Sequence, residues 1–179
     1  MRVFWAHGYA AASVDVLSRA MNVPRASLYQ MFGDKEGLFL AAVAHYSEVS
    51  FAPVMQHLAG DGDLRDDLTA FLVGVVDFAT HDQETLGCLV AGALADAAGC
   101  NLKMRDRLTH QFDRIEDVLS ARIARGQARG QIPSVPAPHD LGVMLAATAR
   151  GLMVRARTGC PANDLYPAAK AAVDLCCRS

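Results

Sequence analysis

The 179-residue sequence is apolar at 52% of its positions and charged at 20%, which is typical of a folded globular protein rather than a disordered one. No apolar run reaches the roughly 20 residues of a membrane-spanning helix, and no basic segment with an apolar core and a cleavage site opens the chain, so we expect a cytoplasmic protein. The net charge is −2, but residues 1–35 carry four basic and two acidic side chains, a mildly basic end of the kind that contacts phosphate.

The helical period dominates the chain and no alternating strand pattern is present, so the sequence predicts an all-α fold of about nine helices. A first segment, 1–7, ends at Gly8, a residue typical of helix ends. A short helix over 13–21 begins with the capping residue Ser13. After a break, a second short helix over 24–31 begins with Pro24 as its first residue.

Six further helices are expected over the rest of the chain. The first of them starts at the capping residue Asp34, a turn cluster follows at 59–63, and Gly99 and Gly130 end two of the later helices. The expected ranges are 34–58, 64–80, 84–98, 102–129, 139–158 and 163–177. The helix over 84–98 is unusually apolar and rich in small residues, which is typical of a central position in a bundle.

The two short helices near the N-terminus have the dimensions of a helix-turn-helix, in which the first helix holds the second at a fixed angle against DNA. The exposed side of the second helix offers a cation at Arg25, an amide at Gln30 and hydroxyls at Ser27 and Tyr29. Arginine can pair with guanine, glutamine with adenine, and hydroxyls with phosphate. A helical hairpin in an ordinary bundle can have the same spacing, so the spacing alone leaves both interpretations open.

The residues around this hairpin carry a specific pattern, with FxxxGYxxxSV over 4–14, MNVPRA over 21–26 and SLYxxFxDKExL over 27–38. The pattern resembles the DNA-binding domain of the tetracycline-repressor (TetR/AcrR) family. The resemblance implies an all-helical homodimer, with a helix-turn-helix domain over 1–45 and an effector-binding and dimerisation domain over 46–179. Members of this family have a longer first helix ahead of the position of Phe4, so we expect the first helix to be truncated here.

Carried over residue by residue, the resemblance implies that one face of this N-terminal head meets DNA. Arg25 and Gln30 would lie in the groove, whereas Tyr29 and Lys35 would hold the phosphate backbone. The complete set of implied DNA contacts is Ser13, Pro24, Arg25, Ala26, Ser27, Tyr29, Gln30 and Lys35. The implied core of the head is Phe4, Gly8, Val14, Leu17, Val23, Leu28 and Phe32. For Tyr29, a buried ring with only its hydroxyl exposed is an equally good interpretation.

Weaker similarity to one subgroup of the family is carried by GCLV at 87–90 and ARGQxxGQI at 124–132. In that subgroup the last two helices of each subunit form a four-helix interface, and a pocket lies among the middle helices. The corresponding interface residues here are Leu141, Met144, Leu145, Thr148, Leu152, Leu165, Ala169, Ala172, Val173 and Cys176. The same apolar faces could instead be ordinary core within one chain.

For the pocket, the candidates are mainly apolar or aromatic side chains on the middle helices, although such side chains are more often core than ligand wall. They are Phe51, Met55, Phe71, Phe78, Cys88, Met104, His110 and Phe112. The apolar composition favours a small hydrophobic or aromatic effector. The spacing of His57, His81 and His110 does not suit a metal, so neither a metal nor a cofactor is expected.

The five cysteines are odd in number and lack a CxxC pair, which argues against a disulfide framework and a zinc ribbon. Cys88 gives an alternative function, because some relatives with the Gly-Cys pair respond to electrophiles or oxidants through that thiol. Its predicted place in the first turn of the helix over 84–98 favours a thiolate, whereas its apolar neighbours favour simple burial. The vicinal pair Cys176 and Cys177 could also oxidise.

The sequence contains no nucleophile elbow, HExxH, phosphate-cradling glycine loop or ExxH carboxylate site, so an enzyme is not expected. A helical interaction protein whose helix-turn-helix no longer binds DNA is a further alternative, favoured by the low positive charge. The residues and the resemblance together predict a one-component transcriptional regulator, a repressor that a small hydrophobic effector releases from a palindromic operator. Its partners would be double-stranded DNA, the effector and a second copy of the chain.

Overall fold

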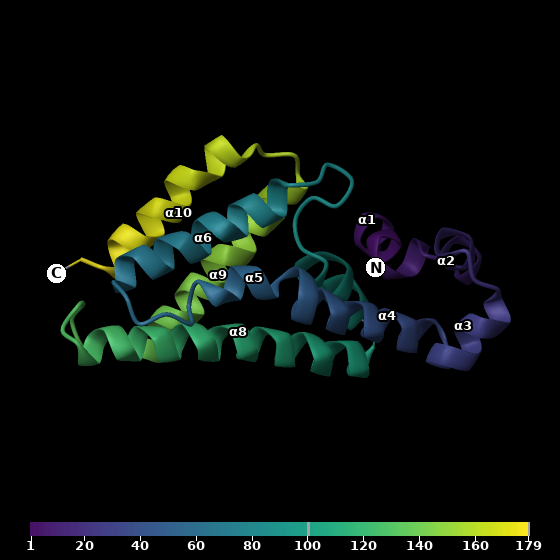
Figure 1. Cartoon of the computed structure of the whole chain (residues 1–179), viewed down its shortest axis with the longest axis horizontal. Coiled ribbons are helices and arrows are strands. Elements are labelled where there is room, and N and C mark those ends of the chain that lie inside the picture. The colour runs from purple at the N-terminus through teal and green to yellow at the C-terminus, as the bar shows by residue number, and fades with distance from the viewer. Residues whose placement is uncertain (100, 179) are drawn as a thin grey trace.

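The computed structural model describes residues 1–99 and 101–178, and within them the chain is helical without any strand (Figure 1). The all-α prediction is confirmed, with ten α-helices and two π-helical segments where about nine helices are expected. The α-helices are α1 (Arg2–Ala11), α2 (Val14–Met21), α3 (Arg25–Phe32), α4 (Lys35–His45), α5 (Ala52–Gln56), α6 (Leu64–Thr80), α7 (Ala95–Ala98), α8 (Leu102–Ala128), α9 (Pro138–Arg157) and α10 (Ala162–Cys176). The π-helical segments are η1 (Tyr46–Ser50) and η2 (Val90–Leu94). None of the helices in the described ranges is long and apolar enough to cross a membrane.

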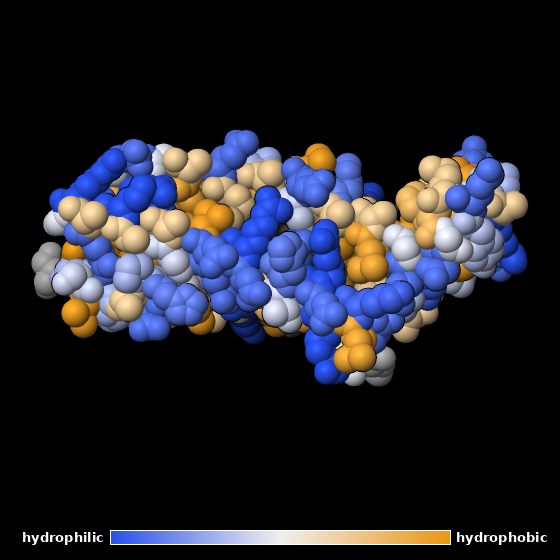
Figure 2. Space-filling model, turned by 90° about the horizontal axis from the view of Figure 1, so that it is seen from below, coloured by the Kyte–Doolittle hydropathy of each residue, from blue (hydrophilic) through white to orange (hydrophobic). Residues whose placement is uncertain are grey.

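The chain forms a small head and a larger body (Figure 1). α1, α2, α3 and the first turn of α4 make up the head, and the rest of α4 runs into the body, where α5 continues in the same direction. In the body, α8 packs along α9, and α6, α9 and α10 pack against one another. Figure 2 shows that the head projects from one end of the body and that hydrophilic side chains cover most of the face in view.

Capping residues fix the ends of the head helices where the sequence predicts them. The Ser13 side chain accepts a hydrogen bond at 3.3 Å from a first-turn amide of α2, and the Asp34 side chain accepts one at 2.8 Å at the start of α4. Asn22, in the left-handed conformation, ends α2. α3 begins at Arg25 with Pro24 in the cap position, one residue later than predicted.

The head is held together by a small apolar core. Phe4, Leu17 and Leu28 are at most 3% exposed. The Phe4 ring also contacts Phe39 of α4, with the ring centroids 4.9 Å apart, so the head packs directly on the helix that leads to the body. Gly8, where the first helix is predicted to end, has φ 77° and kinks α1, and the last residues of α1 continue beyond it.

The single helix predicted over 34–58 is wrong, because the structure divides it into α4, η1 and α5. Pro53 lies in the first turn of α5, where its ring removes a backbone donor and clashes with the carbonyl one turn earlier. The regular helix therefore cannot continue through this point. A π-helical segment widens the turn before it, and such segments are frequent at functional sites.

The helix predicted over 84–98 begins later than expected. Residues 84–89 lie outside a helix, and only η2 and α7 are helical. Gly87 has φ 80°, which a helix does not allow, and its amide donates to the Ala79 carbonyl at 2.8 Å to close the turn after α6. Cys88 therefore precedes η2, and its sulfur accepts the Ala91 amide at 3.4 Å.

One ion pair is buried in the body. Arg122 of α8 has a fully buried side chain, and its Nε lies 2.7 Å from the Asp67 carboxylate of α6. Its Nη2 also donates to the Gly62 carbonyl at 3.0 Å. The pair joins the last third of α8 to the start of α6 and fixes these two helices relative to each other.

Candidate nucleic-acid interface and ligand pocket

α3 lies at the end of the molecule remote from the C-terminus and presents one side to solvent (Figure 1). Leu28 is 3% exposed and Phe32 is half-buried, so these two side chains anchor the helix in the head. The exposed residues of α3 are Arg25, Ala26, Tyr29, Gln30 and Met31. The exposed side of the helix therefore carries a cation, a phenol and an amide beside the apolar Ala26 and Met31.

All eight predicted DNA contacts lie at the surface of the head. Ser27 and Lys35 are half-buried, and the other six are exposed. Tyr29 is 48% exposed, so the alternative of a buried ring does not hold. Their contacts with DNA stay a prediction, but every one of them is accessible.

Two cations of the head already have partners within the chain. Arg25 pairs with Asp15 of α2, and both side chains remain largely exposed. Lys35 donates to the Ala10 carbonyl at 3.2 Å, and its Nζ lies 4.6 Å from the centre of the Tyr9 ring. Partial burial lowers the pKa of Lys35. Because exposed ion pairs contribute little free energy, Arg25 can exchange Asp15 for another partner at small cost.

The head is tied to the body by polar contacts at both ends of the junction. At the start of α4, Glu36 accepts from the Asn101 amide at 2.7 Å and lies 3.1 Å from the Lys103 ammonium. Donation from Asn101, followed by the Lys103 contact, lowers the pKa of Glu36. At the end of α9, Arg157 donates to the Trp5 carbonyl of α1 at 3.3 Å. Movement within the body can therefore reach the head through α4 and α1.

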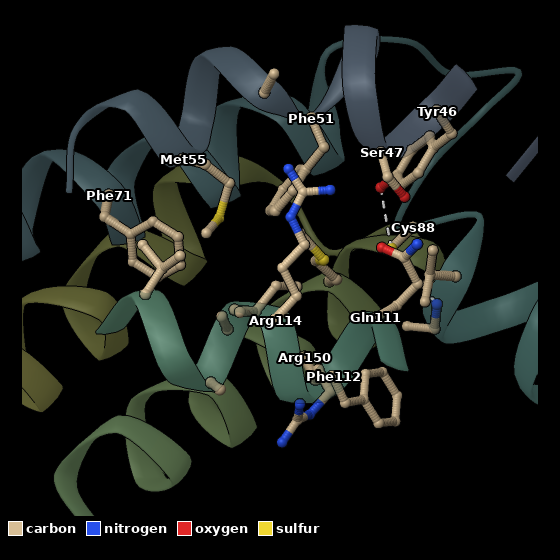
Figure 3. Close-up of a pocket in the computed structure, with 18 of the residues that line it drawn as sticks. Tyr46, Ser47, Phe51, Met55, Phe71, Cys88, Gln111, Phe112, Arg114 and Arg150 are labelled. Atoms are coloured by element: carbon tan, nitrogen blue, oxygen red, sulfur yellow. Dashed lines mark hydrogen bonds between the residues drawn. The ribbon is translucent and has the colours of Figure 1, made fainter. Parts of the chain in front are cut away.

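The body encloses a cavity of about 290 Å³ between η1, α5, α6, η2, α8 and α9 (Figure 3). Apolar side chains form most of its wall, including Phe51 and Met55 at the start of and within α5 and Phe71 of α6, which Figure 3 shows projecting into the same space. Arg114 reaches from α8 towards Phe51. The wall contains no Asp or Glu. The cavity can therefore hold a small, mainly apolar molecule.

Five of the eight predicted pocket residues line this cavity, namely Phe51, Met55, Phe71, Cys88 and Phe112. The other three are corrected by the structure. Phe78 packs instead in an aromatic cluster with Trp5, 5.7 Å between centroids. Met104 is completely buried away from the cavity, and His110 is exposed on the outer side of α8. Helical spacing identifies the buried side of a helix but not which part of that side is left open.

Sequence reasoning missed the polar residues of the cavity, which include Tyr46, Ser47, Gln111 and Arg150. A signal existed for Gln111, because it falls on the same side of α8 as the predicted apolar stripe, where a polar side chain needs a reason. Gln111 is 5% exposed. Arg150 has its guanidinium 4.4 Å from the centre of the Phe112 ring, and its Nη2 lies 2.9 Å from the Glu116 carboxylate of α8. Its Nη1 is buried and has no hydrogen-bond partner within the described residues.

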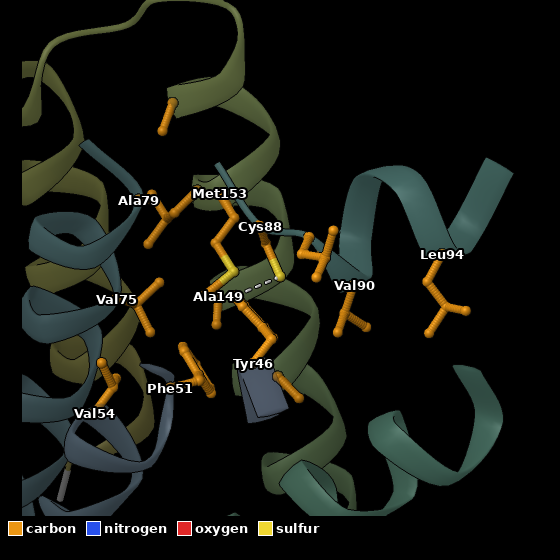
Figure 4. Close-up of a cluster of buried hydrophobic side chains, with 14 of the residues drawn as sticks. Tyr46, Phe51, Val54, Val75, Ala79, Cys88, Val90, Leu94, Ala149 and Met153 are labelled. Carbon is orange, nitrogen blue, oxygen red and sulfur yellow. Dashed lines mark hydrogen bonds between the residues drawn. The ribbon is translucent and has the colours of Figure 1, made fainter. Parts of the chain in front are cut away.

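Cys88 is buried, and its sulfur accepts a hydrogen bond from the Tyr46 hydroxyl at 3.0 Å (Figure 4). Burial raises the pKa of the Cys88 thiol, and it raises the pKa of Tyr46 as well. The structure buries Cys88, as its apolar neighbours predict. It does not place Cys88 in the first turn of a helix, so that prediction is wrong. Cys176 and Cys177 are free and buried. In the part of the chain that the structure describes, no three His, Cys, Asp or Glu residues form a metal-binding group.

Seven of the ten predicted interface residues are buried within the chain itself, which corrects their assignment to a dimer surface. They are Leu141, Leu145, Leu152, Leu165, Ala169, Val173 and Cys176. These seven side chains instead form part of the core of the single chain, which is the alternative interpretation of these apolar faces. Of the remaining three, Met144 is 41% exposed, and Thr148 and Ala172 are half-buried. Other apolar side chains of these helices, Val154 and Leu175, are more than half exposed.

Two family models match the chain. Residues 1–42 match "Bacterial regulatory proteins, tetR family", and residues 65–170 match "Tetracyclin repressor-like, C-terminal domain". Among curated proteins, the transcriptional repressor ComR of Escherichia coli K12 is 26% identical over 176 residues, which cover 92% of this chain and 79% of ComR.

Solved structures match over nearly the whole chain. A cysteine mutant of the TetR-family transcriptional regulator CifR, complexed with a 26-base-pair operator DNA, is 30% identical with a TM-score of 0.87, and the match covers 96% of this chain and 90% of that one. The reduced form of Escherichia coli NemR matches in fold, with 19% identity, a TM-score of 0.83, and coverage of 96% and 89%.

Proposed function

Because the chain belongs to the TetR family of bacterial DNA-binding transcriptional regulators, we propose that it acts as a dimeric repressor, which a small apolar effector releases from a palindromic operator. Residues 1–45 are its DNA-binding domain, and residues 46–179 hold the effector and the dimer interface. The observation that carries the proposal is the exposed polar side of α3, with Arg25, Tyr29 and Gln30 all accessible on a helix anchored by Leu28. The same observation argues against a helical interaction protein that no longer binds DNA.

Recognition of DNA follows from this surface. A helix fits the major groove, where Arg25 can pair with guanine and Gln30 with adenine. Ser13, Tyr29 and Lys35 lie where they can contact phosphate, with Ser13 at the start of α2 adding its helix N-terminus. A two-fold dimer places its two α3 helices about one DNA turn apart, roughly 34–36 Å.

The dimer interface is best supported on the exposed side of α9 and α10. Met144 and Val154 are 41% and 51% exposed, and Ala147 and Gly151 lie between them at helical spacing. Leu175 of α10 is 62% exposed. Exposed large apolar side chains on packed neighbouring helices support an interaction surface there.

Substitution on this surface tests the dimer. Gly151→Arg places a charge at a position with open space around it, so the single chain tolerates it while a paired surface does not. We expect the variant to elute as a monomer in size-exclusion chromatography with light scattering. The matched control, Ala121→Arg on the exposed side of α8, should remain a dimer. A monomeric wild-type protein would contradict the proposal.

The route from effector to DNA is supported by the position of η1. Tyr46 and Ser47 line the cavity, and they follow directly on α4, whose first residue is the head residue Lys35. A ligand that changes η1 therefore changes the helix that carries the head. The ligand shifts the population away from the DNA-bound conformation by no more than its difference in affinity for the two conformations.

A salt titration tests DNA binding. Fluorescence anisotropy with duplex DNA from upstream of the protein's own gene should give an affinity that falls linearly on a log–log plot of salt, with a slope set by the phosphates contacted. An affinity that does not change with salt, or no binding to duplex DNA at low salt, is the contrary result.

A second function is favoured by one observation, since Cys88, although buried, is one of the residues that line the cavity, so a small electrophile in the cavity would lie beside it. In this version the thiol is the sensor and its alkylation or oxidation releases DNA. Cys88→Ser should abolish DNA release by maleimides or oxidants, whereas Cys160→Ser, outside the cavity, should not. If release persists in Cys88→Ser, the thiol is structural and the reversible-effector version stands.

A further inference from the structure

The polar end of the cavity holds three uncharged groups. The Tyr46 hydroxyl, the Ser47 hydroxyl and the Gln111 amide all belong to the wall, and Figure 3 shows the Gln111 side chain directed to the same end as Tyr46 and Ser47. Gln111 is 5% exposed, and within 1–99 and 101–178 its amide is found neither in a side-chain hydrogen bond nor among the fully buried atoms without a partner, so it faces the open space of the cavity. An amide that faces a cavity and has no partner in the chain can form hydrogen bonds with a ligand there.

The hydrogens of the two hydroxyl groups are already committed. Tyr46 donates to the Cys88 sulfur at 3.0 Å, and Ser47 donates to the Val43 carbonyl at 3.0 Å. Each hydroxyl carries a single hydrogen, so both oxygens can only accept a further hydrogen bond. Gln111 can do both, because its amide has two donor hydrogens and an acceptor oxygen. This end of the cavity therefore offers mainly acceptors, with Gln111 as the only strong donor among the three groups.

The charged residues of the wall further limit which ligands fit the cavity. The charged members of the wall are Arg114 and Arg150, and no acidic residue lines the cavity to balance a cation. A carboxylate cannot donate, so at this end it would face two oxygens with the Gln111 amide as its donor. Arg150 is paired with Glu116 and lies beside Phe112, away from this end (Figure 3). A neutral group that both donates and accepts is the one that fits.

Resting on the proposed function, we propose that the effector is a neutral hydroxyl compound, a phenol or an alcohol with an apolar body of one or two rings. Its hydroxyl donates to the Tyr46 or Ser47 oxygen and accepts from the Gln111 amide. The ring lies among Phe51, Met55 and Phe71. The volume of about 290 Å³ is at the lower end of ligand cavities and limits the body to this size.

Calorimetry with matched naphthalenes tests the proposal on the full chain. 2-Naphthol carries the donor hydrogen, 2-methoxynaphthalene has the same ring and oxygen without it, 2-naphthoate carries an anion, and 2-naphthylmethylamine a cation. We expect 2-naphthol to bind at least tenfold more tightly than each of the other three, which corresponds to about 1.4 kcal/mol. Equal affinity for 2-naphthol and its methyl ether, tighter binding of either charged compound, or no binding of 2-naphthol at millimolar concentration would overturn the proposal.

Substitutions at Gln111 and Tyr46 test whether these residues cause the preference for 2-naphthol. Gln111→Leu keeps the size of the side chain and should abolish the tenfold preference for 2-naphthol without weakening 2-methoxynaphthalene. Tyr46→Phe, a second variant that keeps the ring, should reduce the preference. Gln83→Leu makes the same amide-to-apolar change in an exposed loop and should leave it unchanged. A preference that survives in both Gln111→Leu and Tyr46→Phe contradicts the assignment.

The effector proposal and the regulator proposal fail in different experiments. DNA anisotropy with 2-naphthol present measures release, and calorimetry without DNA measures the chemistry of the cavity. Binding with the expected preference but without release contradicts the effector role and leaves the recognition of the hydroxyl standing. Absence of DNA binding at any ligand concentration contradicts the regulator itself.

Discussion

The head and the body of this molecule carry function in opposite ways. The head displays its polar side chains on one exposed helix, with Arg25, Tyr29 and Gln30 within about two turns of α3. The body encloses its polar side chains, with Gln111 and Arg122 at most 5% exposed. A DNA-reading surface needs only a local helix with a firm anchor, whereas a cavity needs several helices to meet. Substitutions in the body should therefore mainly change stability, and substitutions on the exposed side of α3 should mainly change DNA binding.

The largest effect is expected from the buried ion pair of the body. Asp67→Ala leaves the fully buried Arg122 guanidinium without its carboxylate, which typically costs about 3–5 kcal/mol. Urea unfolding should show this loss in the free energy of unfolding, whereas Asp66→Ala, an exposed neighbour, should change it by less than about 1 kcal/mol. An unchanged stability for Asp67→Ala would mean that the body does not depend on this pair.

Two glycines with positive φ sharpen the comparison. At Gly87 in the body, an added Cβ would lie 2.8 Å from Arg157 Cβ and 2.9 Å from the Met153 carbonyl oxygen, so Gly87→Ala should destabilise by about 2–4 kcal/mol. Gly33 in the head has φ 79° but open space, and Gly33→Ala should cost about 1–2 kcal/mol from the backbone alone. Equal losses of unfolding free energy for Gly87→Ala and Gly33→Ala would show that crowding against Arg157 and Met153 contributes nothing.

Substitutions of the predicted DNA contacts Arg25 and Lys35 should leave stability nearly unchanged and reduce DNA binding. Arg25→Ala removes a groove contact and leaves Asp15 unpaired near phosphate, so we expect a loss of about 1–3 kcal/mol of binding free energy and a changed sequence preference. Lys35→Ala should weaken binding to all sequences and reduce the salt slope by about 1. Anisotropy with several duplexes measures both, and Arg105→Ala, exposed on α8, is the matched control. If Arg25→Ala binds DNA with full affinity, the assignment of α3 to the major groove is wrong.

The smallest effect concerns the Cys88 thiol of the body. Burial raises its pKa, so at neutral pH it should react with N-ethylmaleimide more slowly than the half-buried Cys160, and the rate should rise with pH. Its contribution to stability is complete below the ordinary cysteine pKa of about 8.5 and is lost as the pH rises above it, because the unfolded chain then releases the proton first. Mass spectrometry of labelled peptides measures the rates. Faster labelling of Cys88 than of Cys160 at pH 7 would contradict its burial.

The difference between the regions also explains what the sequence could reveal. The head was predictable almost to the residue, because Ser13, Asn22 and Asp34 are local signals that cap helices wherever they occur. The start of α3 lies one residue later than predicted, and α1 continues to Ala11, beyond its predicted end at Gly8. In the body, the division of the predicted 34–58 helix at Pro53 was missed, although proline is itself a local signal.

The cavity was only partly predictable, for a different reason. Phe51 and Phe78 are both aromatic and both lie on inward faces, and only the packing of Phe78 on Trp5 removes it from the wall. The interface residues failed in the same way, since an apolar side such as Leu145 can pack within the chain or against a second copy. Choosing between these requires the positions of helices far apart in the sequence.

Selection from a pool of random duplex DNA by the purified full-length protein tests the central claim most directly. The account predicts an enriched palindrome with half-site centres about one helical turn apart, roughly 10 base pairs, and a change at defined positions in each half when Arg25→Ala is used instead. Enrichment of no sequence, or of a single asymmetric site that Arg25→Ala selects equally well, would contradict it.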